Sequence, residues 1–320
     1  MTGIVARLRA LWSDLPANLR GALWILLAAF LLTGMGALVK HMGKDIPSMQ
    51  MVFFRNLVSV AVVAPLMLRN GFSAFYTKKP GWHVFRTLMG TTGMFCVFYA
   101  FAHLPLAETV AIVFSRPLFA VWLAILFLGE VVGWRRISAA VVGFLGVLVM
   151  VRPGTAAFDP ASLFAVTAAI TAGSIAVIIK KMSATESTAT IILWFSVGSA
   201  VITAVPAFFV WVPPTPMQWV VLFAIGIIGV SGMAALTKGF STGETSFVTP
   251  FDYSRLIYAT AIGFLIFGET PDVFSILGAL IIVSSGYYVA RRELAATRKR
   301  LREKRAAEAA QGPARPSGPD

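Results

Sequence analysis

The stretch that decides the fold reads Gly90-Thr91-Thr92-Gly93-Met94, then Ser115-Arg116, then Gly129-Glu130. It recurs as Gly229-Val230-Ser231-Gly232-Met233, then Ser254-Arg255, then Gly268-Glu269, with every pair 139 residues apart. Twelve of the 51 positions in 90–140 are identical to their mates, and a register of 140 extends the match upstream to pairs such as Lys40 and Lys180. The two halves are therefore predicted to be copies of one structural unit.

The composition indicates a membrane protein. Of 320 residues, 58% are apolar and 13% are charged, and the mean hydropathy is +0.80. A soluble domain carries about 25% charged residues and has too little interior for this much apolar surface. The formal charge of +13 is interpreted as basic loops on the cytoplasmic side rather than as a nucleic-acid interface.

Several kinds of chemistry have no signature in this chain. The single cysteine, Cys96, rules out an internal disulfide, and the three histidines show no metal-ligand spacing. A glycine-rich phosphate loop ending in Lys-Ser/Thr is also absent from the sequence. We therefore expect no metal site, no cofactor and no ATP drive.

Ten apolar runs are each long enough to cross a hydrocarbon core of ~30 Å at ~1.5 Å per residue. They are predicted as helices near 21–39, 48–68, 84–102, 106–128, 134–151, 160–180, 188–211, 217–238, 246–267 and 272–290. The links between them contain turn residues such as Pro and Gly. The predicted fold class is an all-α membrane protein with ten transmembrane helices.

The distribution of basic residues predicts the orientation. With the N-terminus inside, the cytoplasmic segments hold 21 Lys and Arg, whereas the outside links hold only Lys40, Lys44 and Arg152. Both termini are therefore expected in the cytoplasm. Five crossings per half is an odd number, so the second copy enters from the opposite side and the repeat is inverted.

This topology divides the chain into four segments. Residues 1–20 form a basic cytoplasmic segment, either a topology-determining leader or a short amphipathic helix on the membrane. The first five-helix repeat covers 21–151 and the second, inverted, covers 160–290. Residues 291–320 are predicted to be a basic, largely disordered cytoplasmic tail whose start is helical.

Three basic residues remain inside predicted spans, namely Arg55, Arg116 and Arg255. Arg116 and Arg255 are repeat mates, each about ten residues into its span and hence near the bilayer middle. A charge there costs at least ~2.5–3.5 kcal/mol unless it is paired or hydrated. We expect a polar cavity between the halves, where the arginines contact substrate or tie helices together. Asp252, three residues before Arg255 on the same face, favours the structural role for Arg255.

Acidic residues near these arginines are candidates for gating or proton coupling. Asp252 is either a proton-coupling residue or a plain ion-pair partner. Glu108 lies about two turns before Arg116. It is either a gating or pairing residue or an acidic residue at a helix start, where the helix dipole favours it. Glu130 and Glu269 follow matched glycines at the ends of two spans, and we interpret them as helix-end structure.

Small and aromatic side chains complete the candidate set. Four glycines at a spacing of three are predicted at close helix contacts, namely Gly90, Gly93, Gly229 and Gly232. Aromatic residues within spans line the cavity or pack against helices and lipid. The candidates for the cavity are Tyr99, Phe114, Phe119, Trp194, Tyr253 and Tyr258, of which Phe114/Tyr253 and Phe119/Tyr258 are repeat mates.

The motifs together resemble the EamA-type members of the drug/metabolite transporter superfamily over about residues 18–292. They are Phe53-Phe54-Arg55-Asn56, Leu104-Pro105-Leu106-Ala107-Glu108, Leu128-Gly129-Glu130, Gly243-Glu244-Thr245-Ser246, Pro250-Phe251-Asp252-Tyr253-Ser254-Arg255-Leu256 and Phe267-Gly268-Glu269. The resemblance implies a secondary transporter whose central cavity is lined by spans from both halves. Similar members move amino acids, vitamins such as riboflavin, S-adenosylmethionine or amphipathic drugs.

The functional hypothesis is a secondary transporter that moves a small organic metabolite across the bacterial inner membrane by alternating access. The same fold would also serve a multidrug or metabolite exporter. A membrane-embedded enzyme, or a sensor or scaffold whose basic tail binds lipid or a partner, are the alternatives from other classes. The expected partners are the substrate and the lipid bilayer, with no nucleic acid, and the chain is expected to be a monomer or homodimer.

Overall fold

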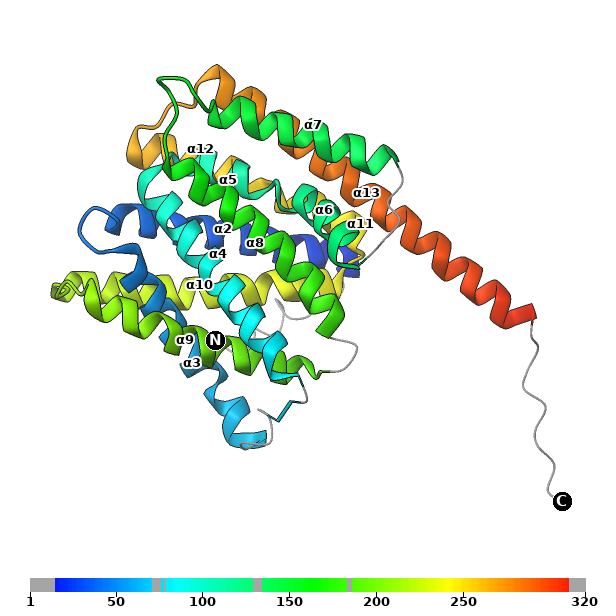
Figure 1. Ribbon diagram of the computed structural model, residues 1–320, viewed down its shortest axis with the longest axis horizontal. Coiled ribbons are helices and arrows are strands. Elements are labelled where there is room, and N and C mark those ends of the chain that lie inside the picture. The colour runs from blue at the N-terminus through cyan, green and yellow to red at the C-terminus, as the bar shows by residue number, and fades with distance from the viewer. Residues whose placement is uncertain (1–14, 71–75, 78, 129–133, 183–185, 311–320) are drawn as a thin grey trace.

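The computed structural model describes residues 15–70, 76–77, 79–128, 134–182 and 186–310, and these form helices joined by short links (Figure 1). Most of the predicted N-terminal segment and the last ten residues lie outside the described part. The helices are α2 (Ala17–Met42), α3 (Ser48–Asn70), α4 (Pro80–His103), α5 (Leu106–Val113), α6 (Arg116–Leu128), α7 (Trp134–Val151), α8 (Ala161–Met182), α9 (Thr188–Phe209), α10 (Pro216–Thr242), α11 (Thr245–Asp252), α12 (Ser254–Phe267) and α13 (Val273–Ala310).

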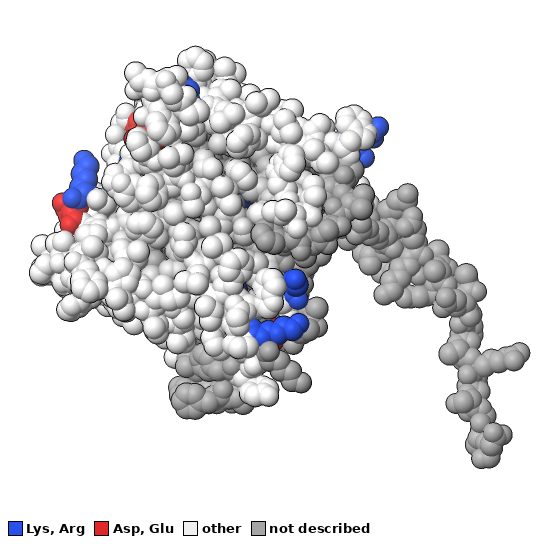
Figure 2. Space-filling model, viewed as in Figure 1, with Lys and Arg blue, Asp and Glu red and all other residues white. Residues whose placement is uncertain are grey.

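The helices form a bundle with a broad apolar surface. Within the described residues, seven helical stretches are long and apolar enough to cross a membrane, and Ile137–Val151 and Ala161–Ile175 are shorter apolar helices. Figure 2 shows an uncharged band over the viewed face, with the Lys, Arg, Asp and Glu side chains at its margins. The all-helical class is confirmed. α13 continues to Ala310, past the predicted end of the last span at 290 (Figure 1).

Two of the predicted spans, 106–128 and 246–267, are broken helices. The first is interrupted between α5 and α6 at Phe114 and Ser115, and the second between α11 and α12 at Tyr253. Pro117 contributes to the first break because it lacks the N–H that a continuous helix needs. Pro250 lies in α11 just before the second. Phe114 and Tyr253 are repeat mates, so both copies break at the same position.

The helices pair in the same way in both halves. α2 packs on α10 as α8 packs on α4, and α3 on α10 as α9 on α4. The pairs α3–α9 and α7–α13 each join corresponding helices of the two halves, and α5–α12 joins the two broken spans. Figure 1 shows α7 and α13 side by side. An exchange of the two halves therefore maps the main helix contacts onto one another.

The predicted packing glycines lie at these helix contacts. A Cβ on Gly93 would meet Thr171 of α8, and a Cβ on its mate Gly232 would lie 2.8 Å from Leu32 of α2. A Cβ on Gly229 would likewise lie 2.7 Å from the sulfur of Met35 in α2. Gly90 is close to α9, where its Cβ would approach a ring at 2.6 Å. A side chain at any of these positions would require the neighbouring side chain or helix to move.

Candidate functional site

A cavity of about 160 Å³ lies where the two broken spans meet. Its lining comes from α2, α4, α5, α6, α10 and α12, and thus from both halves of the chain. The lining residues are Leu32, Thr33, Met35, Val97, Phe101, Val110, Val113, Phe114, Arg116, Met233 and Arg255. The wall is largely apolar and contains the two matched arginines, as expected for a site that holds an amphipathic or charged small molecule.

Asp252 joins the two arginines across the halves. Its Oδ2 accepts a hydrogen bond from Nη2 of Arg116 at 3.1 Å, and its Oδ1 lies 2.8 Å from Nε of Arg255. The Asp252 side chain is 6% exposed, against 15% for Arg255 and 36% for Arg116. One buried carboxylate therefore faces two guanidinium groups, so the cluster keeps one net positive charge.

Two polar groups of the lining are left unsatisfied. Nη2 of Arg255 is buried and has no hydrogen-bond partner among the described residues. The hydroxyl of Thr33, which is 1% exposed, also has no partner in that part of the chain. Buried polar groups normally find a partner, so these two atoms have unused hydrogen-bonding capacity in this conformation. The sequence analysis did not predict Thr33 as a cavity residue. A polar threonine inside the apolar run of α2 was the feature of the sequence that could have indicated it.

The aromatic candidates are distributed over the bundle. The rings of Phe114 and Tyr253 lie 4.9 Å apart at the two helix breaks, and Phe114 lines the cavity. Phe119 instead packs edge-on against Phe144 of α7, and Tyr258 packs in the same way on a phenylalanine of α2. These two side chains are engaged in helix packing and are not part of the cavity lining.

Three further predicted residues are not part of the lining of this cavity. Tyr99 stacks on His103 at 4.0 Å between ring centres, and Trp194 lies 5.2 Å from the ring of His83. Arg55 is 9% exposed, donates to Oδ1 of its neighbour Asn56 at 3.4 Å and lies beside α10. The structure therefore brings together Arg116, Arg255, Asp252, Phe114 and Tyr253, but not these three.

Glu108 lines a second, larger cavity of about 360 Å³ between α5, α7, α12 and α13. The same cavity is lined by Arg152, Glu269 and Asp272, and Nη1 of Arg152 pairs with Oδ2 of Asp272 at 2.6 Å. Glu108 is therefore separate from the arginine cluster. Its carboxylate takes part in no described ion pair with Arg116.

Glu269 does more than end a helix, because its carboxylate pairs with Lys40 at 2.7 Å. The sequence analysis missed this contact. The sequence did contain a signal for this pair. The repeat mate of Lys40 is Lys180 and the repeat mate of Glu269 is Glu130, so a charged residue stands at each of these matched span ends. Glu130 lies outside the described residues.

Comparison with known proteins identifies the family. The sequence profile of the EamA-like transporter family matches residues 19–152 and again residues 159–291. The chain belongs to this EamA-like transporter family. It is therefore a multi-pass integral membrane protein of a family of transporters, not an enzyme, and its partners include a small-molecule substrate and the membrane.

Curated relatives of this EamA-like chain are transporters of several small molecules. An S-adenosylmethionine uptake transporter of Rickettsia prowazekii is 30% identical over 275 residues, covering 86% of this chain and 94% of that protein. A pseudopaline exporter of Pseudomonas aeruginosa is 32% identical over 270 residues, with coverage of 82% and 93%. A riboflavin transporter of Vibrio cholerae is 29% identical over 291 residues, with coverage of 89% and 97%.

A solved crystal structure has the same fold as this EamA-like chain. It matches with a TM-score of 0.56 at 21% identity and covers 84% of this chain and 96% of that one. At this identity the likeness shows the fold alone.

Proposed function

We propose that this EamA-like protein is a secondary transporter that moves a small, carboxylate-bearing metabolite through the cavity between Arg116 and Arg255. The observation that carries the proposal is the excess cation in this cavity. Asp252 neutralises one of the two guanidinium groups, and Nη2 of Arg255 has no partner in the part of the chain that the structure describes. The carboxylate of an incoming molecule would pair with the uncompensated guanidinium group and complete the hydrogen bonding of the site.

This chemistry favours some of the candidate substrates over others. Amino acids and S-adenosylmethionine carry a carboxylate, whereas riboflavin does not. The apolar wall, with Phe101, Phe114, Met35 and Met233, suits the uncharged remainder of such a molecule. Relatives that take up and relatives that export substrates match at similar identity, so the proposal concerns the site and its ligand class.

The transport mechanism we infer is alternating access. The cavity of about 160 Å³ is smaller than the ~300–1,000 Å³ typical of ligand pockets. We infer that it widens when the halves rock apart and open one end of the bundle. Discontinuous helices at mid-depth, matched between two halves, are the usual construction of such a site.

The topology we propose is ten spans arranged as an inverted repeat of five and five, with both termini in the cytoplasm. The matched breaks at Phe114 and Tyr253 and the helix contacts that exchange between halves support it. The excess of Lys and Arg on one side supports the orientation. The repeats would cover 21–151 and 160–290, and the bacterial inner membrane is the proposed location.

Counterflow in proteoliposomes tests the proposal. Vesicles loaded with unlabelled methionine or S-adenosylmethionine should accumulate the labelled compound when they contain the protein. Arg116→Gln should abolish this exchange. Arg135→Gln, which removes an exposed arginine at the start of α7, is the matched control and should retain it. Equal exchange by Arg116→Gln and wild type, or exchange of riboflavin alone, would contradict the proposed site.

A further inference from the structure

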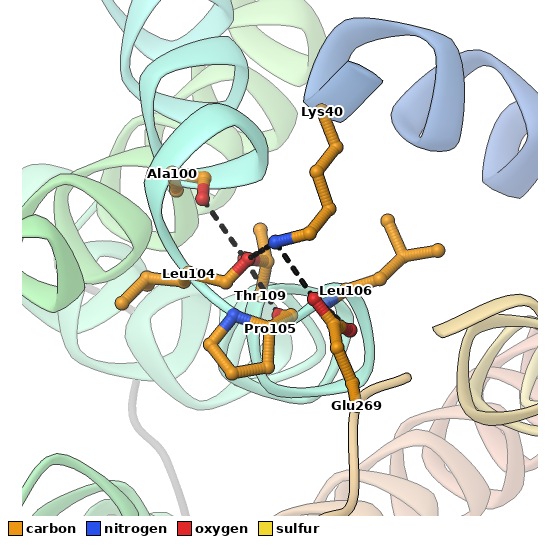
Figure 3. Close-up of polar contacts among 7 residues, drawn as sticks. All are labelled: Lys40, Ala100, Leu104, Pro105, Leu106, Thr109 and Glu269. Atoms are coloured by element: carbon orange, nitrogen blue, oxygen red, sulfur yellow. Dashed lines mark hydrogen bonds and ion pairs between the residues drawn. The ribbon is translucent and has the colours of Figure 1, made fainter. Parts of the chain in front are cut away.

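Lys40 and Glu269 join the ends of four helices, α2, α4, α5 and α12, at one end of the bundle. Nζ of Lys40, in the last turn of α2, lies 2.7 Å from Oε1 of Glu269 and donates to the carbonyl oxygen of Leu104 at 2.7 Å (Figure 3). The other carboxylate oxygen of Glu269 accepts the backbone N–H of Leu106 at 2.8 Å. The two side chains are only 15% and 17% exposed.

Each of these contacts satisfies a helix end that lacks an intrahelical partner. Leu104 is the C-cap of α4, and Leu106 is the first residue of α5 after Pro105. A cation is favoured at the carbonyl end of a helix and an anion at the amide end. Lys40 therefore caps α4 and Glu269 caps α5. Both capping side chains come from elsewhere in the chain, and Glu269 comes from the opposite half.

The backbone around Glu269 is built to present its carboxylate. Gly268 has a φ of +67°, which favours glycine, and it ends α12 by donating to Phe264 O at 3.2 Å. The N–H of Glu269 then donates to Gly263 O at 3.0 Å. A Cβ on Gly263 would lie 2.7 Å from Oε2 of Glu269. Because glycine has no Cβ, the carboxylate of Glu269 can lie directly against the backbone of α12 at Gly263.

Two helices, α5 and α12, run from the Lys40–Glu269 contact to the central cavity. α5 has eight residues and runs from Leu106 to the helix break beside Arg116. α12 packs against α5 and runs from the break beside Asp252 toward Glu269. The two broken spans, α5–α6 and α11–α12, are thus tied twice, by Glu269 to Leu106 at this end of the bundle and by Asp252 to Arg116 at the cavity. Separation at this end requires the first tie to break.

We propose that Lys40 and Glu269 form a latch that closes this end of the bundle and must open once in each transport cycle to expose the central cavity. This inference rests on the proposed function, because it assigns a step of alternating access to two residues outside the substrate site. The basic-residue distribution predicts that the latch faces away from the cytoplasm. In this proposal the closed latch separates the cavity from that side of the membrane.

Cysteine accessibility tests the latch directly. A Cys96→Ala, Val113→Cys background places the single thiol on the cavity lining. Its reaction rate with a membrane-impermeant maleimide is measured in vesicles of both orientations. Lys40→Met and Glu269→Gln should each raise the rate from the latch side about tenfold, which corresponds to ~1.4 kcal/mol of lost closure. The rate from the opposite side should not rise.

Matched variants separate the latch from a general charge effect. Lys44→Met removes an exposed lysine from the link that follows α2 and should leave the rate unchanged. Lys40→Arg keeps the cation and should retain closure. The double reversal Lys40→Glu/Glu269→Lys restores the ion pair but places each charge at the wrong helix end, so it should remain open. Unchanged labelling in both single variants would overturn the latch.

A second measurement applies if the single variants fold poorly. Cysteines at positions 40 and 269 in the Cys96→Ala background, joined by a short bis-methanethiosulfonate, should stop counterflow until a reductant is added. Full exchange by the cross-linked protein would overturn the latch. The labelling rates do not require a transported substrate. A protein with latch-dependent labelling but no exchange of any candidate would therefore contradict the proposed function and leave the latch supported.

Discussion

Replacement of Asp252 by Asn provides the sharpest test of the charge cluster. The carboxylate is 6% exposed and faces Arg116 at 3.1 Å and Arg255 at 2.8 Å. Removing one member of a buried ion pair costs ~3–5 kcal/mol, because the remaining charge is uncompensated. Arg116 is 36% exposed, so solvent screens it and it adds little. We therefore expect Asp252→Asn to lower the free energy of unfolding by about 3 kcal/mol, mainly through Arg255.

The assay requires no engineered probe. Cys96 is the only cysteine and is buried, so a thiol-reactive fluorescent dye reports unfolding of the detergent-solubilised protein. At ~2–4 °C per kcal/mol, the value for domains of 150–250 residues, the melting temperature of Asp252→Asn should fall by about 6–12 °C. Arg116→Gln should lower it much less, because Asp252 remains paired with Arg255.

The double variant Asp252→Asn/Arg255→Gln provides the control. It removes the uncompensated cation together with the carboxylate, so it should melt above Asp252→Asn, and the difference measures the coupling between the two groups. An Asp252→Asn protein that melts within 1 °C or so of wild type would refute the view that this carboxylate holds buried cations. If Arg116→Gln and Arg255→Gln lowered the melting temperature equally, the view that Asp252 stabilises the fold mainly through Arg255 would be refuted.

Three other predictions follow from packing and ionisation. Phe119→Ala should leave the apparent affinity for methionine or S-adenosylmethionine unchanged, because this ring packs on α7 rather than on the cavity. Gly232→Ala should destabilise the protein by ~1–3 kcal/mol in the dye assay, because the new methyl group meets α2. Hydrogen bonds from Ser275, with a smaller contribution from Arg152, lower the pKa of Asp272 below its ordinary value. Its stabilising contribution is present above the unfolded-state pKa of about 4 and is lost as pH falls through the lower folded-state value. Asp272→Asn should therefore make the melting temperature less sensitive to acid below about pH 4.

Each of these predictions has a control. Phe114→Ala alters the cavity wall and should weaken ligand binding. If Phe114→Ala and Phe119→Ala lowered the affinity equally, the assignment of Phe114 to the cavity and of Phe119 to helix packing would be contradicted. Gly34→Ala, at a helical glycine with open space around its Cβ position, should be tolerated, and equal losses at Gly34 and Gly232 would contradict the packing argument. If the melting temperature of Asp272→Asn fell with acid as steeply as that of wild type, Asp272 would not contribute to stability through its lowered pKa.

The sequence alone predicts much of the helix arrangement. Hydrophobic runs and basic links predict the spans, and the repeat predicts that Arg116 and Arg255 are equivalent. The pairing of Asp252 with Arg255 follows from their spacing of three, because the backbone at the intervening Tyr253 keeps helical φ and ψ angles and side chains three apart then lie on one face. These inferences depend only on local geometry and on comparison of the two copies.

Contacts between the halves could not be predicted in the same way. Asp252 and Arg116 are 136 residues apart, and the relative rotation and height of their helices depend on packing across the whole bundle. The same holds for Lys40 and Glu269. The breaks within 106–128 and 246–267 were also missed, because apolar composition measures the length of a span and not the continuity of its hydrogen bonds.

Binding of a matched acid and ester is the measurement that tests the central claim most directly. Melting temperatures are measured with S-adenosylmethionine or methionine and with the corresponding methyl ester, in wild type, Arg116→Gln and Arg135→Gln. A ligand at 100 times its dissociation constant adds ~2.7 kcal/mol to the free energy of unfolding. The account predicts a shift with the free carboxylate in wild type and Arg135→Gln, and no shift with the ester or in Arg116→Gln. Equal shifts with acid and ester, or an undiminished shift in Arg116→Gln, would contradict it.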